Sequence, residues 1–247
     1  MSKFSKKIMM VLALSLVFVM VFAGCSAYKQ DAVKGGDADA IVTSNGGLAV
    51  KQGAYLYYIN GLTSTSDIKE KEDNAFGNVV KGAIMRCELD KNGNITDKKV
   101  LVPMMALSTD KNGGISVFGN WVYYTTPSVK KDNSGAMQTS YLEFMRTSID
   151  GTKTEEIATI EGAGLQYKYS ASSLMYFKNG EIKRVNYNND KVLKEELVAD
   201  KVSGVIFPQN EVFNPKSAPV DDVVFYTKAA ADEKATKLRY LERGYVA

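Results

Sequence analysis

Histidine is absent from this chain of 247 residues, and cysteine occurs only twice. Without histidine, neither a Ser-His-Asp nor a Cys-His catalytic group can be built, because both need an imidazole to accept the proton of the nucleophile. The same scarcity excludes a structural zinc site, which takes four nitrogen or sulfur ligands. The sequence therefore predicts no metal, no cofactor and no catalytic residues.

Cys25 ends a segment that we do not expect to belong to the fold. Three lysines among the first seven residues precede the uncharged apolar run from Ile8 to Gly24, which is too short for a comfortable membrane span and typical of a signal-peptide core. The small residues Ala23 and Gly24 before Cys25 resemble the lipobox of bacterial lipoproteins. That resemblance implies cleavage before Cys25, lipidation of its thiol and anchoring at the extracytoplasmic face of a bacterial cell membrane. An ordinary signal peptide and a single N-terminal anchor helix are the alternatives.

The excess of basic residues belongs to that segment. The chain has 31 Lys+Arg and 28 Asp+Glu, and because its first 25 residues hold three lysines and no acid, the rest balances at 28 against 28. A neutral domain lacks the clustered cations that neutralise phosphates, so we predict no nucleic-acid partner. The membrane contact is then expected through the N-terminal lipid. An unidentified protein or glycan is the expected ligand.

Three regions follow from composition. We assign residues 1–24 to a lipoprotein signal peptide, 25–46 to the lipidated N-terminus and a flexible tether rich in small and polar residues, and 47–247 to a repeat domain. Once Cys25 is lipidated, Cys87 has no partner for a disulfide, and we expect a small buried thiol there.

The repeat domain contains four copies of a short strand pattern, two apolar residues followed by two aromatic ones. The copies are Tyr55–Tyr58, Trp121–Tyr124, Leu174–Phe177 and Val223–Tyr226. Downstream of each copy comes a strand with one arginine, and these are Arg86, Arg146, Arg184 and Arg239; the chain has only one other arginine. A ring of ligand-binding cations is one interpretation. The favoured interpretation is a structural one, in which each planar guanidinium pairs with an acid or clamps carbonyl oxygens of neighbouring strands.

Turn residues complete the repeat. Asp90–Asn94, Asp150-Gly151 and Asn179-Gly180 stand where tight reversals are needed, and such pairs supply the positive φ angles of hairpin turns. The unit of Val122–Thr125 followed by Met145–Thr152 resembles one blade of the YWTD-type β-propeller of low-density-lipoprotein-receptor-related proteins. It is also similar to bacterial lipoprotein domains of unknown function related to that propeller.

This resemblance implies an all-β fold, a β-propeller-like array of antiparallel blades. The family would have six blades, whereas the sequence shows about four copies. We expect the array either to be incomplete within the chain or to be closed by the N-terminal strand Ala40–Thr43, donated as the missing fourth strand of the last repeat. Closure would remove an exposed sheet edge.

The loops between the aromatic and arginine strands are long in three repeats, and equivalent loops of a radial array emerge on one side, where insertions often form a binding face. Their charged residues are the candidates for that face, with solvated loops as the alternative. They are Asp67, Lys69, Glu70, Lys130, Lys131 and Asp132.

Three classes of function fit the sequence. A non-catalytic, membrane-anchored lipoprotein that binds or scaffolds through a propeller face is favoured. An extracytoplasmic carbohydrate-active enzyme would use carboxylates, for which Asp221-Asp222 and Glu195-Glu196 supply acids, although strand neighbours point to opposite faces. A solute-binding lipoprotein of a transporter is disfavoured, because alternating strands and helices are missing.

Overall fold

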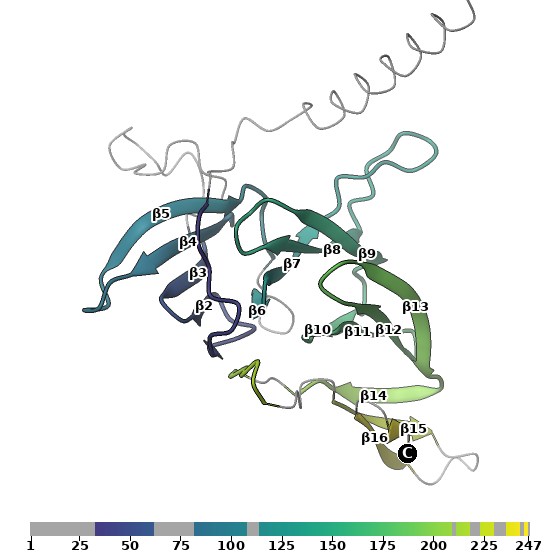
Figure 1. Cartoon of the computed structure of the whole chain (residues 1–247). Coiled ribbons are helices and arrows are strands. Elements are labelled where there is room, and N and C mark those ends of the chain that lie inside the picture. Colours follow the sequence, from purple (N-terminus) through teal and green to yellow (C-terminus); the bar gives the residue numbers. More distant parts are fainter. Residues whose placement is uncertain are drawn as a thin grey trace, which may run out of the picture.

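The computed structural model describes residues 33–61, 82–107, 114–208, 211–217, 223–229, 236–242 and 245–246. These residues form seventeen strands and no helix, in four antiparallel sheets. Within each sheet, every strand pairs with the next one along the chain, so each sheet is a meander. The prediction of an all-β chain with four antiparallel units is confirmed. Figure 1 shows the sheets following one another around the molecule, with β2, β6 and β10 near the centre of the view and β5, β9 and β13 at the periphery.

The first sheet contains β1 (Val42–Thr43), β2 (Ala49–Gln52), β3 (Tyr55–Ile59), β4 (Ile84–Leu89) and β5 (Ile95–Val102). The second contains β6 (Ser116–Phe118), β7 (Trp121–Pro127), β8 (Tyr141–Ser148) and β9 (Thr154–Glu161). The third contains β10 (Gln166–Tyr169), β11 (Ser173–Lys178), β12 (Glu181–Tyr187) and β13 (Val192–Ala199). The fourth contains β14 (Val202–Ile206), β15 (Val224–Ala229), β16 (Thr236–Glu242) and β17 (Tyr245–Val246).

The predicted repeats coincide with these sheets. The aromatic strands are β3, β7, β11 and β15, and the arginine strands are β4, β8, β12 and β16, each paired with its aromatic strand. The turns also lie where the sequence predicts them. Asn179 and Gly180, between β11 and β12, have φ angles of 51° and 79°, which is the positive pair that a two-residue type I′ turn needs.

Apolar side chains fill the space between successive sheets. Val50 and Tyr57 of the first sheet pack against Val122 and Tyr124 of the second. On its other face the second sheet meets the third through a largely aromatic cluster, in which the rings of Tyr123 and Tyr187 stack with centroids 5.1 Å apart. A third cluster joins the third and fourth sheets. Burial of this aromatic and aliphatic surface supplies most of the stabilisation between sheets.

The ends of the array meet differently from the predicted closure. The first strand, β1, pairs with β2 of its own sheet, and the last sheet has its own fourth strand, β17. The N-terminal strand nevertheless contacts the last repeat, because Val42 forms an isolated antiparallel bridge with Phe213, which lies between β14 and β15. Its N–H and carbonyl are both paired with Phe213, at 2.8 and 2.9 Å. The ring of Phe213 packs edge-on against Phe118 at 5.1 Å.

The predicted tether, residues 25–46, needs correction at its C-terminal end. Its described part, residues 33–46, is bound to the sheets. Asn45 is buried, and its side chain pairs with both backbone groups of Val117 in β6, accepting from N–H at 2.7 Å and donating to the carbonyl at 3.2 Å. Val33 and Ala38 pack on the cluster between the first two sheets. The segment thus imitates a neighbouring strand at the inner edge of the second sheet.

Candidate functional site

The repeated arginines are the most specific feature of the sequence, and Arg86 shows what they contact. Arg86 is buried, its guanidinium lies over the ring of Tyr55 at 4.1 Å, and it donates to two carbonyl oxygens. One belongs to Lys34 of the N-terminal segment at 2.9 Å, and the other to Ile149 of the second sheet at 3.1 Å. A planar donor fork with its face on an aromatic ring suits this arrangement, which a point charge would not satisfy.

Arg146 repeats the arrangement one sheet further on. It is fully buried and lies over the indole of Trp121 at 4.1 Å. Its Nε and Nη2 donate to one carboxylate oxygen of Glu155 at 2.8 and 2.5 Å, and Nη1 donates to the carbonyl of Asn188 in the third sheet at 2.5 Å.

The two acceptor carbonyls occupy equivalent places. Ile149 follows the last residue of β8, and Asn188 follows the last residue of β12. Arg86 and Arg146 therefore each tie their own sheet to the turn after the third strand of the next one. We call this contact the arginine clamp. It favours the structural interpretation of these two arginines, since their guanidinium groups donate to carbonyl and carboxylate oxygens of the protein itself.

Arg184 and Arg239 do not repeat the clamp. Arg184 is partly exposed and donates through Nε and Nη2 to Glu196 on the neighbouring strand β13. Arg239 differs already in backbone register. Across the strand pairs, Arg86 lies opposite Tyr57, Arg146 opposite Tyr123, Arg184 opposite Met175 and Arg239 opposite Tyr226.

These pairs correct the repeat alignment. Tyr57, Tyr123 and Met175 face the following sheet, whereas Tyr226 packs toward the preceding one. The backbone position of Arg239 therefore lies on the opposite face of its sheet, and only three of the four arginines occupy one repeat position. In β11 the aligned aromatic Tyr176 is likewise displaced by one residue. A shift of one residue moves a strand position to the other face, which sequence alignment by residue type does not detect.

Burial and nearby charges shift the pKa values of two groups in the Arg146 clamp, Glu155 and Tyr123. Partial burial by itself would raise the pKa of Glu155, but hydrogen bonds from Lys153 and Arg146 lower it below its usual value. Burial raises the pKa of Tyr123 to about 12, against the nearby positive charge of Arg146, so the phenol stays neutral. The clamp is a paired, internally satisfied unit rather than an open cation site.

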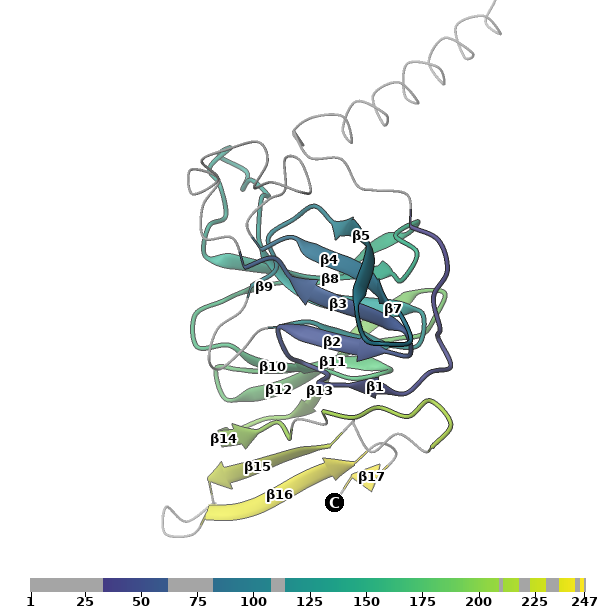
Figure 2. The ribbon, with the colours of Figure 1, turned by 90° about the vertical axis from the view of Figure 1, so that its left-hand side faces the viewer.

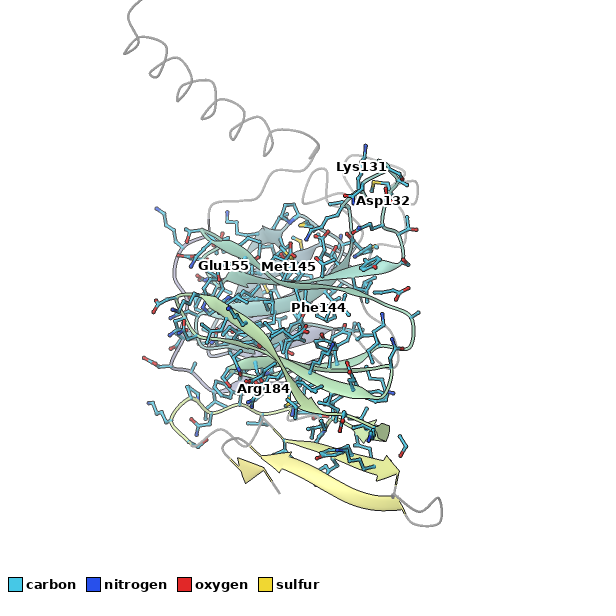
Figure 3. All side chains as sticks on the ribbon, turned by 90° about the vertical axis from the view of Figure 1, so that its right-hand side faces the viewer. Lys131, Asp132, Phe144, Met145, Glu155 and Arg184 are labelled. Carbon is cyan, nitrogen blue, oxygen red and sulfur yellow. The ribbon has the colours of Figure 1, made fainter. Side chains whose placement is uncertain are left out.

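The loop of the second repeat forms a projecting hairpin. Lys131 and Met137 make an isolated bridge, and the carboxylate of Asp132 accepts from Ser134 and Ala136 within the turn. Figure 3 shows Lys131 and Asp132 at one extremity, away from Glu155 and Arg184 on the sheets.

The ammonium of Lys130, at the base of this hairpin, donates to Glu156 and Thr159 at distances of 2.6 to 2.8 Å. The structure thus places three of the candidate binding-face residues together on the hairpin, with Lys130 and Asp132 engaged in local contacts. The other three, Asp67, Lys69 and Glu70, lie outside the described residues, as does Cys25.

Of the two acid pairs considered for catalysis, the one that the structure describes, Glu195-Glu196, makes local contacts. Glu195 accepts a hydrogen bond from the phenol of Tyr176, and Glu196 accepts from Asn186 and Arg184. The Asn186 and Arg184 bonds lower the pKa of Glu196, which is the wrong direction for a general acid. Asp221 and Asp222 lie outside the described residues.

Sequence reasoning missed a small open hollow beside the N-terminal segment. Its volume is about 380 Å³, and it is lined by residues 35, 36 and 38 of that segment together with Asn120 and residues 148–150. The pair Gly35-Gly36 was the sequence signal that could have indicated a close backbone approach here. A Cβ on Gly35 would lie 2.7 Å from the hydroxyl of Tyr55, and one on Gly36 2.5 Å from Ile149. The carboxylate of Asp150 already accepts from Ser148 and Thr152.

Cys87 is a buried free thiol, as predicted, and burial raises its pKa. Within the described ranges no cluster of three or more acidic, cysteine or histidine side chains is arranged to hold a metal ion. The part of the chain that the structure describes has no helix with the length and apolar character to cross a membrane. No protein-family model and no curated protein matches this sequence.

Proposed function

We propose that the chain is a bacterial lipoprotein, anchored through Cys25 at the extracytoplasmic face of the cell membrane, whose β-propeller-like domain binds or scaffolds without catalysis. The observation that carries the anchoring is the position of Cys25, directly after two small residues at the end of an apolar run that follows a basic segment. An N-terminus of this kind is typical of exported chains, and several acyl chains would hold the domain firmly at the membrane.

The propeller-like architecture is supported by three regularities. The four sheets are successive meanders, β2, β6 and β10 of the first three sheets lie near the centre of the view in Figure 1, and the same arginine clamp joins the first sheet to the second and the second to the third. Repeat arrays gain stability from contacts that recur between neighbouring units, and the clamp is such a contact.

A binding or scaffolding role is supported by how the charged groups are used. The junctions between sheets are filled with aromatic and aliphatic side chains. Arg146 and Glu196 are each paired with side chains of their own or a neighbouring strand. A glycosidase would instead need two carboxyl groups facing one pocket, separated by about 5 to 9.5 Å. The hairpin carrying Lys131 and Asp132 projects from the sheets at one extremity of the molecule in Figure 3.

The anchoring is tested by metabolic labelling with a tagged fatty acid in a bacterial host. The full chain should incorporate the label and fractionate with membranes, whereas Cys25→Ser should lose both properties. Cys87→Ser is the matched control, because this buried thiol is expected to carry no lipid and the variant should label like the wild type. Label retained by Cys25→Ser would contradict the assignment of the anchor.

A further inference from the structure

The N-terminal segment, residues 33–46, is attached to the sheets from its first described residue onward. Val33 packs on the apolar cluster between the first two sheets, and the carbonyl of Lys34 accepts a hydrogen bond from the buried Arg86 at 2.9 Å. At its other end the buried Asn45 pairs with a strand of the second sheet. The segment therefore moves with the sheets, and it fixes the point at which the chain enters the domain.

This point lies on one side of the array. Residues 35, 36 and 38 share a hollow with Asn120, in the turn between β6 and β7, and with residues 148–150, at the turn between β8 and β9. We call the side that carries these two turns the turn side. The opposite ends of β7 and β8 are joined by the hairpin of residues 128–140, and we call that side the loop side. Figure 2 shows the N-terminal segment, in purple, running along one side of the sheets.

The length of the strands separates the two sides. Strand β8 has eight residues, which at a rise of about 3.3 Å per residue give roughly 25 Å. The hairpin extends beyond Pro127, the last residue of β7, to the bridge between Lys131 and Met137, which adds up to about 13 Å at the same rise. A lipid surface that faced the loop side would therefore lie more than about 25 Å from the point of entry.

The chain between the proposed anchor and this point is short. Cys25 lies eight residues before Val33. Whatever its conformation, a chain of eight residues spans at most about 28 Å. It reaches a membrane beside the turn side with length to spare. To place the loop side on the same membrane, it would have to run straight along the whole strand and also pass the hairpin. This comparison rests on the proposed lipidation of Cys25.

Charge gives no competing preference that would turn the domain. The residues after Cys25 carry 28 basic and 28 acidic side chains, so the domain as a whole is neither attracted to nor repelled by anionic lipid. The short chain and its place of attachment are then what sets the orientation.

We propose that the N-terminal segment orients the domain, with the turn side toward the lipid surface that carries the anchor and the loop side away from it. The partner of the turn side is that lipid surface. The hairpin, which Figure 3 shows at one extremity through Lys131 and Asp132, is then presented away from the membrane, where a partner outside the lipid surface can reach it.

Three exposed asparagines provide matched positions for a label. Asn92 and Asn189 lie on the turn side, in the turns after β4 and β12, and Asn133 lies on the hairpin. Asn92→Cys, Asn189→Cys and Asn133→Cys are each made in the full chain, lipidated in a bacterial host and labelled with the same fluorescent maleimide. The unsubstituted chain is the blank, because Cys87 is buried and the thiol of Cys25 carries the lipid.

The labelled chains are inserted into preformed phosphatidylcholine vesicles that contain a phospholipid with an acceptor dye on its headgroup. Energy transfer from the labels at Asn92 and Asn189 should exceed transfer from the label at Asn133 by at least about twofold, because the length of the strands separates the two sides. A flexible Gly-Ser linker of about twenty residues, inserted between Lys29 and Gln30, should make the three values equal, since such a chain reaches around the domain. Added salt or anionic lipid should leave the order unchanged, because charge does not set the orientation.

The outcomes separate this proposal from the anchor. A chain that does not float with the vesicles refutes the anchor, and the orientation falls with it. A chain that floats but gives equal transfer from all three labels, or greater transfer from Asn133, refutes the orientation alone. Strong transfer from Asn92 with weak transfer from Asn189 also refutes it, because the domain would then lie on the edge of its first sheet. A linker variant that keeps the original order would show that the short chain does not set the orientation. Thermal unfolding of each labelled variant shows that it is folded.

Discussion

Replacing Arg146 by lysine tests the arginine clamp directly, because the charge stays and only the geometry changes. The guanidinium of Arg146 makes three donations, two to Glu155 and one to the carbonyl of Asn188, while its plane lies on the ring of Trp121. A lysine ammonium is one compact charge and cannot reach both acceptors while covering the indole. The variant therefore keeps one ion pair and loses the link to the third sheet.

The expected cost follows from those contacts. A charge-assisted hydrogen bond contributes about 1.5 to 3 kcal/mol, and a cation over an aromatic ring about 0.5 to 2 kcal/mol. Arg146 is fully buried, so water does not replace what is lost. We expect Arg146→Lys to lower the free energy of unfolding by about 2 to 4 kcal/mol. For a domain of this size that corresponds to a fall in Tm of about 5 to 12 °C.

The chain provides its own probe for this experiment, because Trp121 is its only tryptophan. Thermal unfolding followed by Trp121 fluorescence reports the global transition, and the emission spectrum at low temperature reports the ring that Arg146 covers. Arg184→Lys is the matched control, since that arginine is partly exposed and donates to Glu196 on the neighbouring strand; its cost should stay near 1 kcal/mol or less. If Arg146→Lys melted at the same temperature as Lys131→Ala, an exposed change on the hairpin, the structural role of the clamp would be refuted.

Two other predictions concern stability. The pKa of Glu155 is held below its usual value in the folded chain, so its stabilisation is complete above about pH 5 and is lost as the pH falls through the folded pKa; the difference in free energy of unfolding between wild type and Glu155→Gln should therefore vanish on acidification, and a constant difference would contradict this. Asn45→Ala leaves both backbone groups of Val117 without their side-chain partner and should cost about 2 to 4 kcal/mol in chemical denaturation, whereas Asn92→Ala in an exposed turn should cost almost nothing.

Local chemistry made much of the fold predictable. The aromatic strands, the arginine strands and the turns at Asp150-Gly151 and Asn179-Gly180 all lie where their residues predict them. Strand alternation and turn preferences act over a few residues, so they can be read without knowing which sheets become neighbours. The buried state of Cys87 was also predictable, because a lone thiol usually behaves as a small buried apolar group.

The relations between sheets were not predictable in this way. Arg239 matches the other arginines in residue type and spacing, but its backbone position lies opposite Tyr226 and thus on the other face. Facing depends on register, which is fixed by packing against the neighbouring sheet. The acceptors of the clamp, at Ile149 and Asn188, are backbone carbonyls in turns, and a sequence carries no mark of which carbonyl an arginine will meet.

The N-terminal segment was mispredicted because composition was the only guide. Small and polar residues are typical of tethers, but here Gly35 and Gly36 let the backbone pass close to Tyr55 and Ile149, where a side chain would collide. The side chain of the buried Asn45 pairs with the backbone of Val117 in β6, as a neighbouring strand would. These residues belong to the packed domain because the second sheet lies beside them, and composition does not reveal which sheet a segment will contact.

The bridge between Val42 and Phe213 has a consequence for how the chain folds. The N–H and carbonyl of Val42 pair with Phe213, which lies in the last repeat. The outer edge of the first strand therefore stays unpaired until nearly the whole chain has been synthesised. Contacts between residues so distant in sequence form slowly, because the intervening chain must first be organised. The three earlier sheets can be built from local pairings, and the joining of the two ends is then the late step. A chain that stops before Glu211 would leave the outer edge of its first strand unpaired and free to join another molecule.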